Sequence, residues 1–257
     1  MGTIRPQSQP QNRFTVPLTA SQQNQSEFLP LYIFLPCKYG IDDIKKNRLK
    51  VSMLDELNDP YEAMPCFVDQ AGECCPSEYV RSNFLSPISR KAGIICFSGK
   101  SDDPVLWAHY ADKHRGVAFE FVFPRDEMPQ HVTYVDKRVV VNISEKDEIK
   151  TDYMTFYEKL IFSKWSSWKY EDEYRLLERT EDLVRKEQKG KVLYFKQPIP
   201  IKSFRRIILG WKCKVKANRM RHILDTSGFG DVLVATAKVN DSEFSMSISE
   251  CGCGGDH

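Results

Sequence analysis

The residues best suited to chemistry in this chain lie in one short segment, Lys164-Trp-Ser-Ser-Trp-Lys-Tyr-Glu-Asp-Glu-Tyr-Arg175. Glu171 and Glu173 are two positions apart, so on a strand both carboxylates share one face, about 7 Å from each other. At that distance they raise each other's pKa or hold one ligand from two sides. Arg175 extends the same row, whereas Tyr174 and Leu176 lie on the opposite face. The segment therefore predicts an acidic pair with a neighbouring cation.

Two interpretations of this segment are open. In the first, the acid pair of Glu171 and Glu173 bonds ribose hydroxyls or stabilises a cationic transition state, and a neighbouring Arg or Lys holds a phosphate. In the second, the segment is a solvated strand face whose charges pair across strands. Trp165 and Trp168 favour a cleft, because tryptophans beside ionisable groups are less typical of a plain surface.

A second group of candidate residues lies on a predicted helix from Asp103 to about His114. Ser101 can cap it, Pro104 suits its first turn, and Gly116 can close it in the left-handed conformation. Trp107 and Tyr110 form one stripe of this helix, and His109 points in another direction. One of these three rings therefore faces something other than the core, and we include all three among the predicted substrate-binding residues.

The third candidate is Asn58-Asp-Pro-Tyr-Glu62, which has the composition of a turn. Asn58, Asp59, Tyr61 and Glu62 are added to the predicted substrate-binding set, together with Tyr32 of the first strand and with Lys164, Trp168 and Arg175. Gly-rich phosphate loops, the GxSxG elbow and HExxH are absent, so P-loop NTPases, α/β-hydrolases and zincins are not supported.

The cysteines and histidines do not predict a metal site. Eight cysteines occur, but no pair has CxxC spacing, and His109 and His114 are five positions apart. Reduced thiols of a cytosolic chain explain these cysteines. We predict no metal ligands.

Composition indicates a single folded domain. The chain has 257 residues, 41% of them hydrophobic, and a formal net charge of only +2, so it lacks the basic excess of a dedicated nucleic-acid binder. Residues 1–27 are rich in Gln, Ser and Pro and are expected to be a disordered leader. The expected domain spans residues 28–249, and the expected flexible Cys/Gly tail spans 250–257. No stretch resembles a membrane span or a signal peptide, so we expect a cytoplasmic protein.

Hydrophobic periodicity predicts an α+β fold, with a mixed or antiparallel sheet of about eight strands and three or four packed helices. Strands are expected at 31–35, 49–52, 94–98, 117–123, within 164–179, at 192–195, 206–209, 232–238 and 243–248. Helices are expected at 41–47, 103–114, 144–162 and 215–226. The last strand is expected at a sheet edge. Val117, Phe119, Phe121 and Phe123 alternate, so this face of their strand is predicted to be buried, with Glu120 on the other.

Several of these motifs together resemble a known family. Leu57-Asn-Asp-Pro-Tyr-Glu62, Leu106-Trp-Ala-His-Tyr-Ala-Asp112, His114-Arg-Gly-Val-Ala-Phe-Glu-Phe121, Trp168-Lys-Tyr-Glu-Asp-Glu-Tyr-Arg175 and Ile207-Ile-Leu-Gly210 occur in order within residues 28–215. They resemble the bacterial family catalogued as domain of unknown function twenty-nine seventy-one. Members are described near abortive-infection proteins, so the resemblance implies a role in phage defence but no defined activity.

At the level of fold, the layout also resembles ADP-ribosyltransferases. In that layout a late-strand glutamate bonds the ribose of NAD and an aromatic ring stacks on nicotinamide. The resemblance implies that Glu173 or Glu171 is the late glutamate and that Tyr110 or Trp107 is the stacking ring.

Three functional hypotheses follow. The first is an ADP-ribosyltransferase-like enzyme that uses NAD as substrate and modifies a nucleic-acid or protein acceptor. In it Glu173 is the catalytic carboxylate, helped by Glu171, and Arg175 or Lys164 binds the pyrophosphate. The second is a nuclease-like enzyme that binds a divalent metal through Asp59, Glu62, Glu171 and Glu173. The third is a non-catalytic binding module whose partner surface contains Trp107, His109 and Trp168.

Overall fold

The computed structural model describes residues 28–69, 71–142 and 153–251. The fold is α+β, as predicted, but it contains more strands than the expected eight: eleven belong to one mixed sheet, and two further pairs form small parallel sheets. Four helices of seven or more residues accompany them in this part of the chain. No helix among the described residues is both long and apolar enough to cross a membrane.

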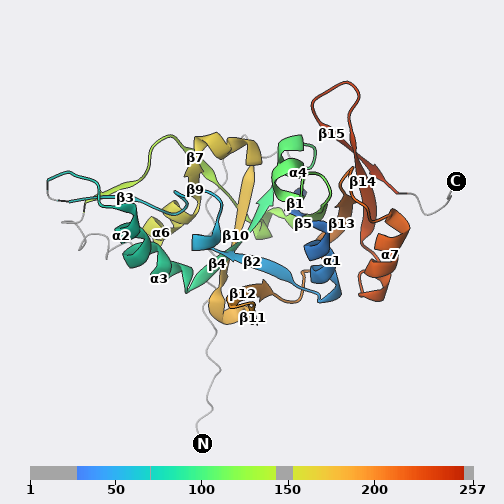
Figure 1. Ribbon diagram of the computed structural model, residues 1–257, viewed down its shortest axis with the longest axis horizontal. Coiled ribbons are helices and arrows are strands. Elements are labelled where there is room, and N and C mark those ends of the chain that lie inside the picture. The colour runs from blue at the N-terminus through green and yellow to red at the C-terminus, as the bar shows by residue number, and fades with distance from the viewer. Residues whose placement is uncertain (1–27, 70, 143–152, 252–257) are drawn as a thin grey trace, which may run out of the picture.

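The order of strands in the large sheet is β11-β12-β2-β4-β1-β5-β13-β14-β15, and β10 branches from β4 and pairs in turn with β6 (Figure 1). The bounds of these strands are β1 Phe28–Leu35, β2 Leu49–Met53, β4 Ala92–Ser98, β5 Val117–Pro124, β6 Gln130–His131, β10 Glu173–Arg179, β11 Val184–Gln188, β12 Lys191–Lys196, β13 Phe204–Leu209, β14 Leu233–Val239 and β15 Met246–Glu250. The small sheets pair β3 (Cys66–Val68) with β8 (Val140–Asn142) and β7 (Thr133–Val135) with β9 (Ser163–Trp165).

Helices pack at both ends of the sheet. Figure 1 shows α1 (Cys37–Lys45) and α7 (Ala217–Thr226) at one end, and α2 (Ser77–Val80), α3 (Ser86–Ser89) and α6 (Tyr153–Ile161) at the other. The helix α7 connects β13 to β14, which are parallel, as such a crossover requires. Of the helix expected at 144–162, residues 144–152 lie outside the described residues, as do the predicted leader 1–27 and residues 252–257.

The strand β5 at the centre of the sheet confirms the alternation seen in the sequence. Val117, Phe119, Phe121 and Phe123 all belong to the main core, where β1, β13, α1 and α7 also contribute side chains. Glu120 points to the other face but is buried there, because Arg206 of the neighbouring strand binds its carboxylate. The predicted edge position of β15 is also confirmed.

The helix α4 (Pro104–Tyr110) is shorter than predicted. Asp103, not Ser101, caps it, because the Asp103 carboxylate accepts a hydrogen bond from the backbone N–H of Val105. The chain turns left-handed at Asp112, Lys113 and His114 rather than at Gly116. A glycine is needed at 116 for a different reason: a Cβ atom there would lie 2.1 Å from the carbonyl oxygen of Leu35.

Candidate functional site

A split in the sheet forms the first cavity of the site. One edge of β4 pairs with β10 along its whole length, from Ala92 to Ser98. Its other edge pairs with β2 only at Gly93 and Ile94, and with β1 only at Ser98. Between those contacts, β1 and β2 diverge and leave a cavity of about 330 Å³, which we call the split cavity. Cys96 and Phe97 of β4 line it.

Five charged side chains meet beside the split cavity and form what we call the charge cluster. Glu62 comes from the turn after β2, Lys164 from β9, Glu171 from the segment that follows, and Glu173 and Arg175 from β10. All five are buried. The structure therefore brings together residues that the sequence presents as two separate motifs.

The turn that delivers Glu62 forms as its composition predicts. Asp59 is buried, and its carboxylate accepts a hydrogen bond of 2.9 Å from the backbone N–H of Tyr61. The carbonyl of Asp59 also accepts from the backbone N–H of Glu62. This local bonding, which is typical of an Asx turn, directs Glu62 inward while Tyr61 stays exposed.

Glu171 does not lie on the same strand as Glu173, and this prediction was wrong. A 3₁₀ helix, Ser166–Glu171, interrupts the segment between β9 and β10. Asp172 then adopts the left-handed conformation, with φ of 46°, and β10 begins at Glu173. The two carboxylates meet because this tight turn returns the chain to Lys164, not because strand pleating places them in a row.

Arg175 is the most enclosed member of the charge cluster, with 1% of its surface exposed. Its guanidinium donates two hydrogen bonds to the Glu173 carboxylate, from Nε at 2.8 Å and from Nη2 at 3.0 Å. Its Nη1 pairs with Glu62 Oε1 at 2.8 Å and also donates to the carbonyl of Ile161. The expectation that Arg175 holds a phosphate is therefore not supported, because each of its three nitrogens already contacts a protein oxygen and Arg175 lines neither the split cavity nor the second cavity described below.

Lys164 links the three carboxylates. Its Nζ lies 2.5 Å from Glu171 Oε2, 2.8 Å from Glu173 Oε2 and 3.9 Å from Glu62 Oε2. The ammonium also lies 5.0 Å from the centre of the Trp168 ring, in a cation–π contact. Three carboxylates face two cations, so the cluster has one negative charge in excess when all its groups are ionised.

The pKa values of the cluster reflect competition between burial and pairing. Burial alone would raise the pKa of Glu173, but the charges and hydrogen bonds of Arg175 and Lys164 lower it to about 2. For Glu62, burial outweighs the effect of Arg175, and its pKa is raised. Burial lowers the pKa of Lys164, but the three carboxylates raise it further, so Lys164 stays protonated. Glu173 is therefore a permanent carboxylate at neutral pH.

Tyr110 and Asn58 extend the cluster to the wall of the split cavity. The Tyr110 hydroxyl donates a hydrogen bond to Glu171 Oε1. Burial, followed by the charge of Glu171, raises the pKa of Tyr110, and Asn58 also bonds to its hydroxyl. Tyr110, Asn58, Glu171, Glu173, Lys164 and Glu62 all line the split cavity. The sequence-predicted catalytic pair is thus joined by four of the predicted substrate-binding residues.

A fifth predicted substrate-binding residue, Tyr32, is buried on β1 and also lines the split cavity, whereas the remaining predicted residues lie outside it. His109 is exposed and lies 3.3 Å from the Tyr170 hydroxyl, and Trp168 covers Lys164 from the side. Trp107 is fully buried in a hydrophobic cluster, and its indole N–H donates to the carbonyl of Ser101. Trp107 is therefore a core residue and is available neither to stack on a ligand nor to bind a partner.

The structure also adds residues that were not predicted. The backbone N–H of Glu173 donates to the Tyr134 hydroxyl at 2.8 Å, and the Ser98 hydroxyl donates to the carbonyl of Glu171 at 2.6 Å. Both contacts fix the positions of the two glutamates. They bridge segments far apart in sequence, and no local pattern signals them.

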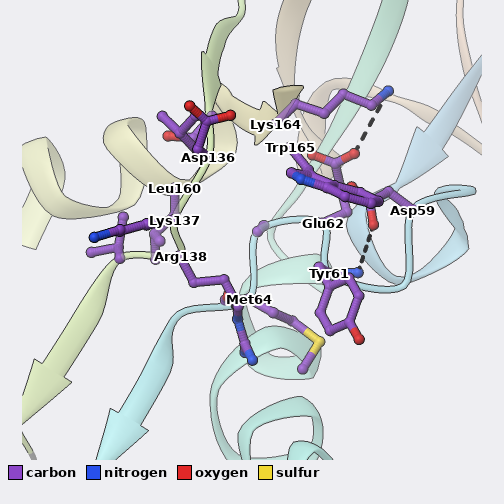
Figure 2. A pocket seen from close by; sticks show the side chains of 14 residues that line it. Asp59, Tyr61, Glu62, Met64, Asp136, Lys137, Arg138, Leu160, Lys164 and Trp165 are labelled. Atoms are coloured by element: carbon purple, nitrogen blue, oxygen red, sulfur yellow. Dashed lines mark hydrogen bonds and ion pairs between the residues drawn. The ribbon is translucent and has the colours of Figure 1, made fainter. Parts of the chain in front are cut away.

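A second cavity of about 330 Å³ lies on the other side of Glu62 and Lys164 (Figure 2), and we call it the aromatic cavity. Its walls come from the turn that holds Asp59 and Tyr61, from residues 135–139, and from α6 and β9. Figure 2 shows Trp165 and Tyr61 on one side of it, and Lys137 and Leu160 on the other. Glu62 and Lys164 line both cavities.

Metal ligation finds little support in this geometry. Among the described residues, no group of three or more His, Cys, Asp or Glu side chains is arranged to hold a metal ion. The carboxylates of the charge cluster instead form ion pairs with Lys164 and Arg175.

Comparisons with protein-family models, with curated proteins and with solved structures find no match to this chain. The family resemblance of the motifs therefore stays a prediction, and the case for function depends on the site itself.

Proposed function

We propose that the protein is an ADP-ribosyltransferase-like enzyme that takes NAD as its substrate and transfers ADP-ribose to an acceptor. The observation that carries this proposal is the pair of carboxylates, Glu171 and Glu173, in the wall of the split cavity, next to Tyr110 and Asn58. Such a wall offers acceptors to ribose hydroxyls and negative charge to a developing cation.

The reaction needs stabilisation of positive charge. As the bond between ribose C1′ and nicotinamide breaks, its electron pair leaves with nicotinamide and the ribose gains oxocarbenium character. A fixed negative charge in a site shielded from water stabilises such a transition state far more than the same charge in bulk water. The acceptor then forms a bond to C1′ and releases its proton. The charge cluster, with one carboxylate in excess, suits this step.

Glu171 is the better candidate for direct contact with ribose. Glu173 is held by two hydrogen bonds from Arg175 and one from Lys164. Glu171 is bound by Lys164 and by the hydroxyl of Tyr110, which itself faces the cavity. We therefore assign the contact with ribose to Glu171, and we assign to Glu173 the positioning of Lys164 and a fixed charge. Lys50, which is exposed and lines the same cavity, is a candidate to bind phosphate.

The test is NAD consumption by the purified protein, measured as released nicotinamide by chromatography, with and without nucleic-acid and protein acceptors. We expect Glu171→Gln to lower the rate by a hundredfold or more, typical of the loss of one electrostatic contact to a transition state. The melting temperature should change little, because the amide retains a hydrogen-bond acceptor for Lys164.

Glu178→Gln is the matched control. Glu178 lies on β10, the strand that follows Glu171, is buried and pairs with Lys196 Nζ at 2.8 Å, but it does not line the split cavity. The Glu178→Gln variant should consume NAD at the same rate as the unaltered protein. No NAD turnover and no saturable NAD binding, or equal rate losses in both variants, would overturn the proposal.

A further inference from the structure

The aromatic cavity has the features of a site for a planar ring. Two large aromatic side chains on its wall are unusually accessible: Trp165 is 51% exposed and Tyr61 is 54% exposed. The Arg138 guanidinium lies 5.4 Å from the centre of the Tyr61 ring and adds a cation to this face. Exposed rings beside an arginine are the usual platform on which proteins stack nucleobases.

The inner end of the cavity supplies polar groups to recognise the edge of such a ring. Glu62 and Lys164 are buried there. Glu62 Oε2 is 3.9 Å from Lys164 Nζ, which is beyond hydrogen-bond distance. A carboxylate accepts from base N–H groups and an ammonium donates to base carbonyl or ring nitrogen atoms, so the two groups suit the polar edge of a base.

Charge and size at the rim fit a nucleobase that carries a phosphate. Lys137 and Arg138 are exposed there, against one exposed acid, Asp136, so the rim has a net positive charge. The volume of about 330 Å³ is near the lower end of ligand pockets, which typically span about 300–1,000 Å³. A single base with its sugar fits this range better than a peptide helix does.

We propose that the aromatic cavity binds a phosphate-bearing nucleobase, stacked on Trp165 and Tyr61 with its polar edge toward Glu62 and Lys164. The base comes either from a single-stranded nucleic acid or from a free mononucleotide. This site shares Glu62 and Lys164 with the split cavity but lies on their other side, and it does not depend on the NAD chemistry proposed above.

The test is a direct binding measurement without NAD. A fluorescein-labelled single-stranded oligonucleotide of mixed sequence, and separately AMP, GMP, CMP and UMP, are titrated at low ionic strength. Anisotropy reports the oligonucleotide, and calorimetry reports the mononucleotides. We expect saturable binding that weakens about tenfold or more in Trp165→Ala and in Tyr61→Ala, as expected for the loss of one stacking partner.

Trp211→Ala is the matched control, because Trp211 is also an exposed tryptophan beside a cation. Its ring lies 4.6 Å from Lys212 Nζ, and it is outside the aromatic cavity. This variant should bind as the unaltered protein does. Binding of the oligonucleotide alone assigns the site to nucleic acid, and equal binding of mononucleotides assigns it to free nucleotides. No binding of either probe, or equal weakening in Trp211→Ala, would overturn the proposal.

Discussion

Replacement of Arg175 by methionine is expected to destabilise the protein severely. Arg175 neutralises two buried carboxylates, Glu173 through two hydrogen bonds of 2.8 and 3.0 Å, and Glu62 through an ion pair of 2.8 Å. Methionine fills much of the volume but leaves only Lys164 to balance three carboxylates. Removal of one partner from a buried ion pair typically costs about 3–5 kcal/mol. We therefore expect a loss of at least this size in the free energy of unfolding.

The effect of pH gives this prediction a distinctive signature. In the unaltered protein the pKa of Glu173 is lowered from 4.5 to about 2, so its pairing stabilises the fold above pH 4.5 and is lost as the pH falls toward 2. Without Arg175, only Lys164 opposes the effect of burial on Glu173, so the pKa of Glu173 rises. The variant then gains stability relative to the unaltered protein as the acid becomes protonated. The difference between the two proteins should therefore shrink as the pH falls from about 6 to about 3.

The assay is urea unfolding followed by circular dichroism at several pH values, with the double variant Arg175→Met/Glu173→Leu beside the single one. The double variant should recover part of the lost stability, because it removes a stranded carboxylate together with its partner. A single-variant loss below about 1 kcal/mol at neutral pH, within the range of exposed ion pairs, would refute the reasoning. A loss of unfolding free energy that does not change with pH would also refute it.

Three further predictions follow from other parts of the structure. Trp107→Ala should lower the free energy of unfolding by about 3–5 kcal/mol in urea titrations, because the indole is fully buried. Gly116→Ala should cost about 1–3 kcal/mol in the same assay, since the added methyl group meets the carbonyl of Leu35. Cys213, whose pKa is lowered to about 7 by its hydrogen bond with Cys37, should react with iodoacetamide at a rate that rises through pH 7 rather than pH 9, as measured by mass spectrometry.

The elements that the sequence predicts well are those with strong local patterns. The alternation of Val117 to Phe123 predicts a strand with one buried face, and the structure confirms it. Pro104 at the start of α4 and the turn at Asp59 follow from the intrinsic preferences of these residues, and both occur. The short strands β3, β6, β7 and β8 were not predicted, because their pairing depends on distant partners rather than on their own two or three residues.

The sequence predicts only part of the candidate site, because some of its contacts join residues that lie far apart in the chain. The carboxylates and cations of residues 164–175 were predicted as one candidate group, and Glu62 was included from a separate motif. The ion pair between Glu62 and Arg175 joins residues nearly half the chain apart, so no spacing rule indicates it. The enclosure of Trp107 was missed because helical periodicity places a ring on a stripe but does not say which stripe faces the core.

The charge cluster also has a consequence for the order in which the chain folds. Its members come from a turn, a short strand, a 3₁₀ helix and a long strand, and the cluster is complete only when the intervening loops have closed. Loop closure has an entropic cost before such contacts form, and isolated charges lose hydration before they gain partners. The cluster should therefore assemble after the folding transition state. Substitutions within it should then accelerate unfolding more than they slow refolding, so the cluster determines how long the native state persists.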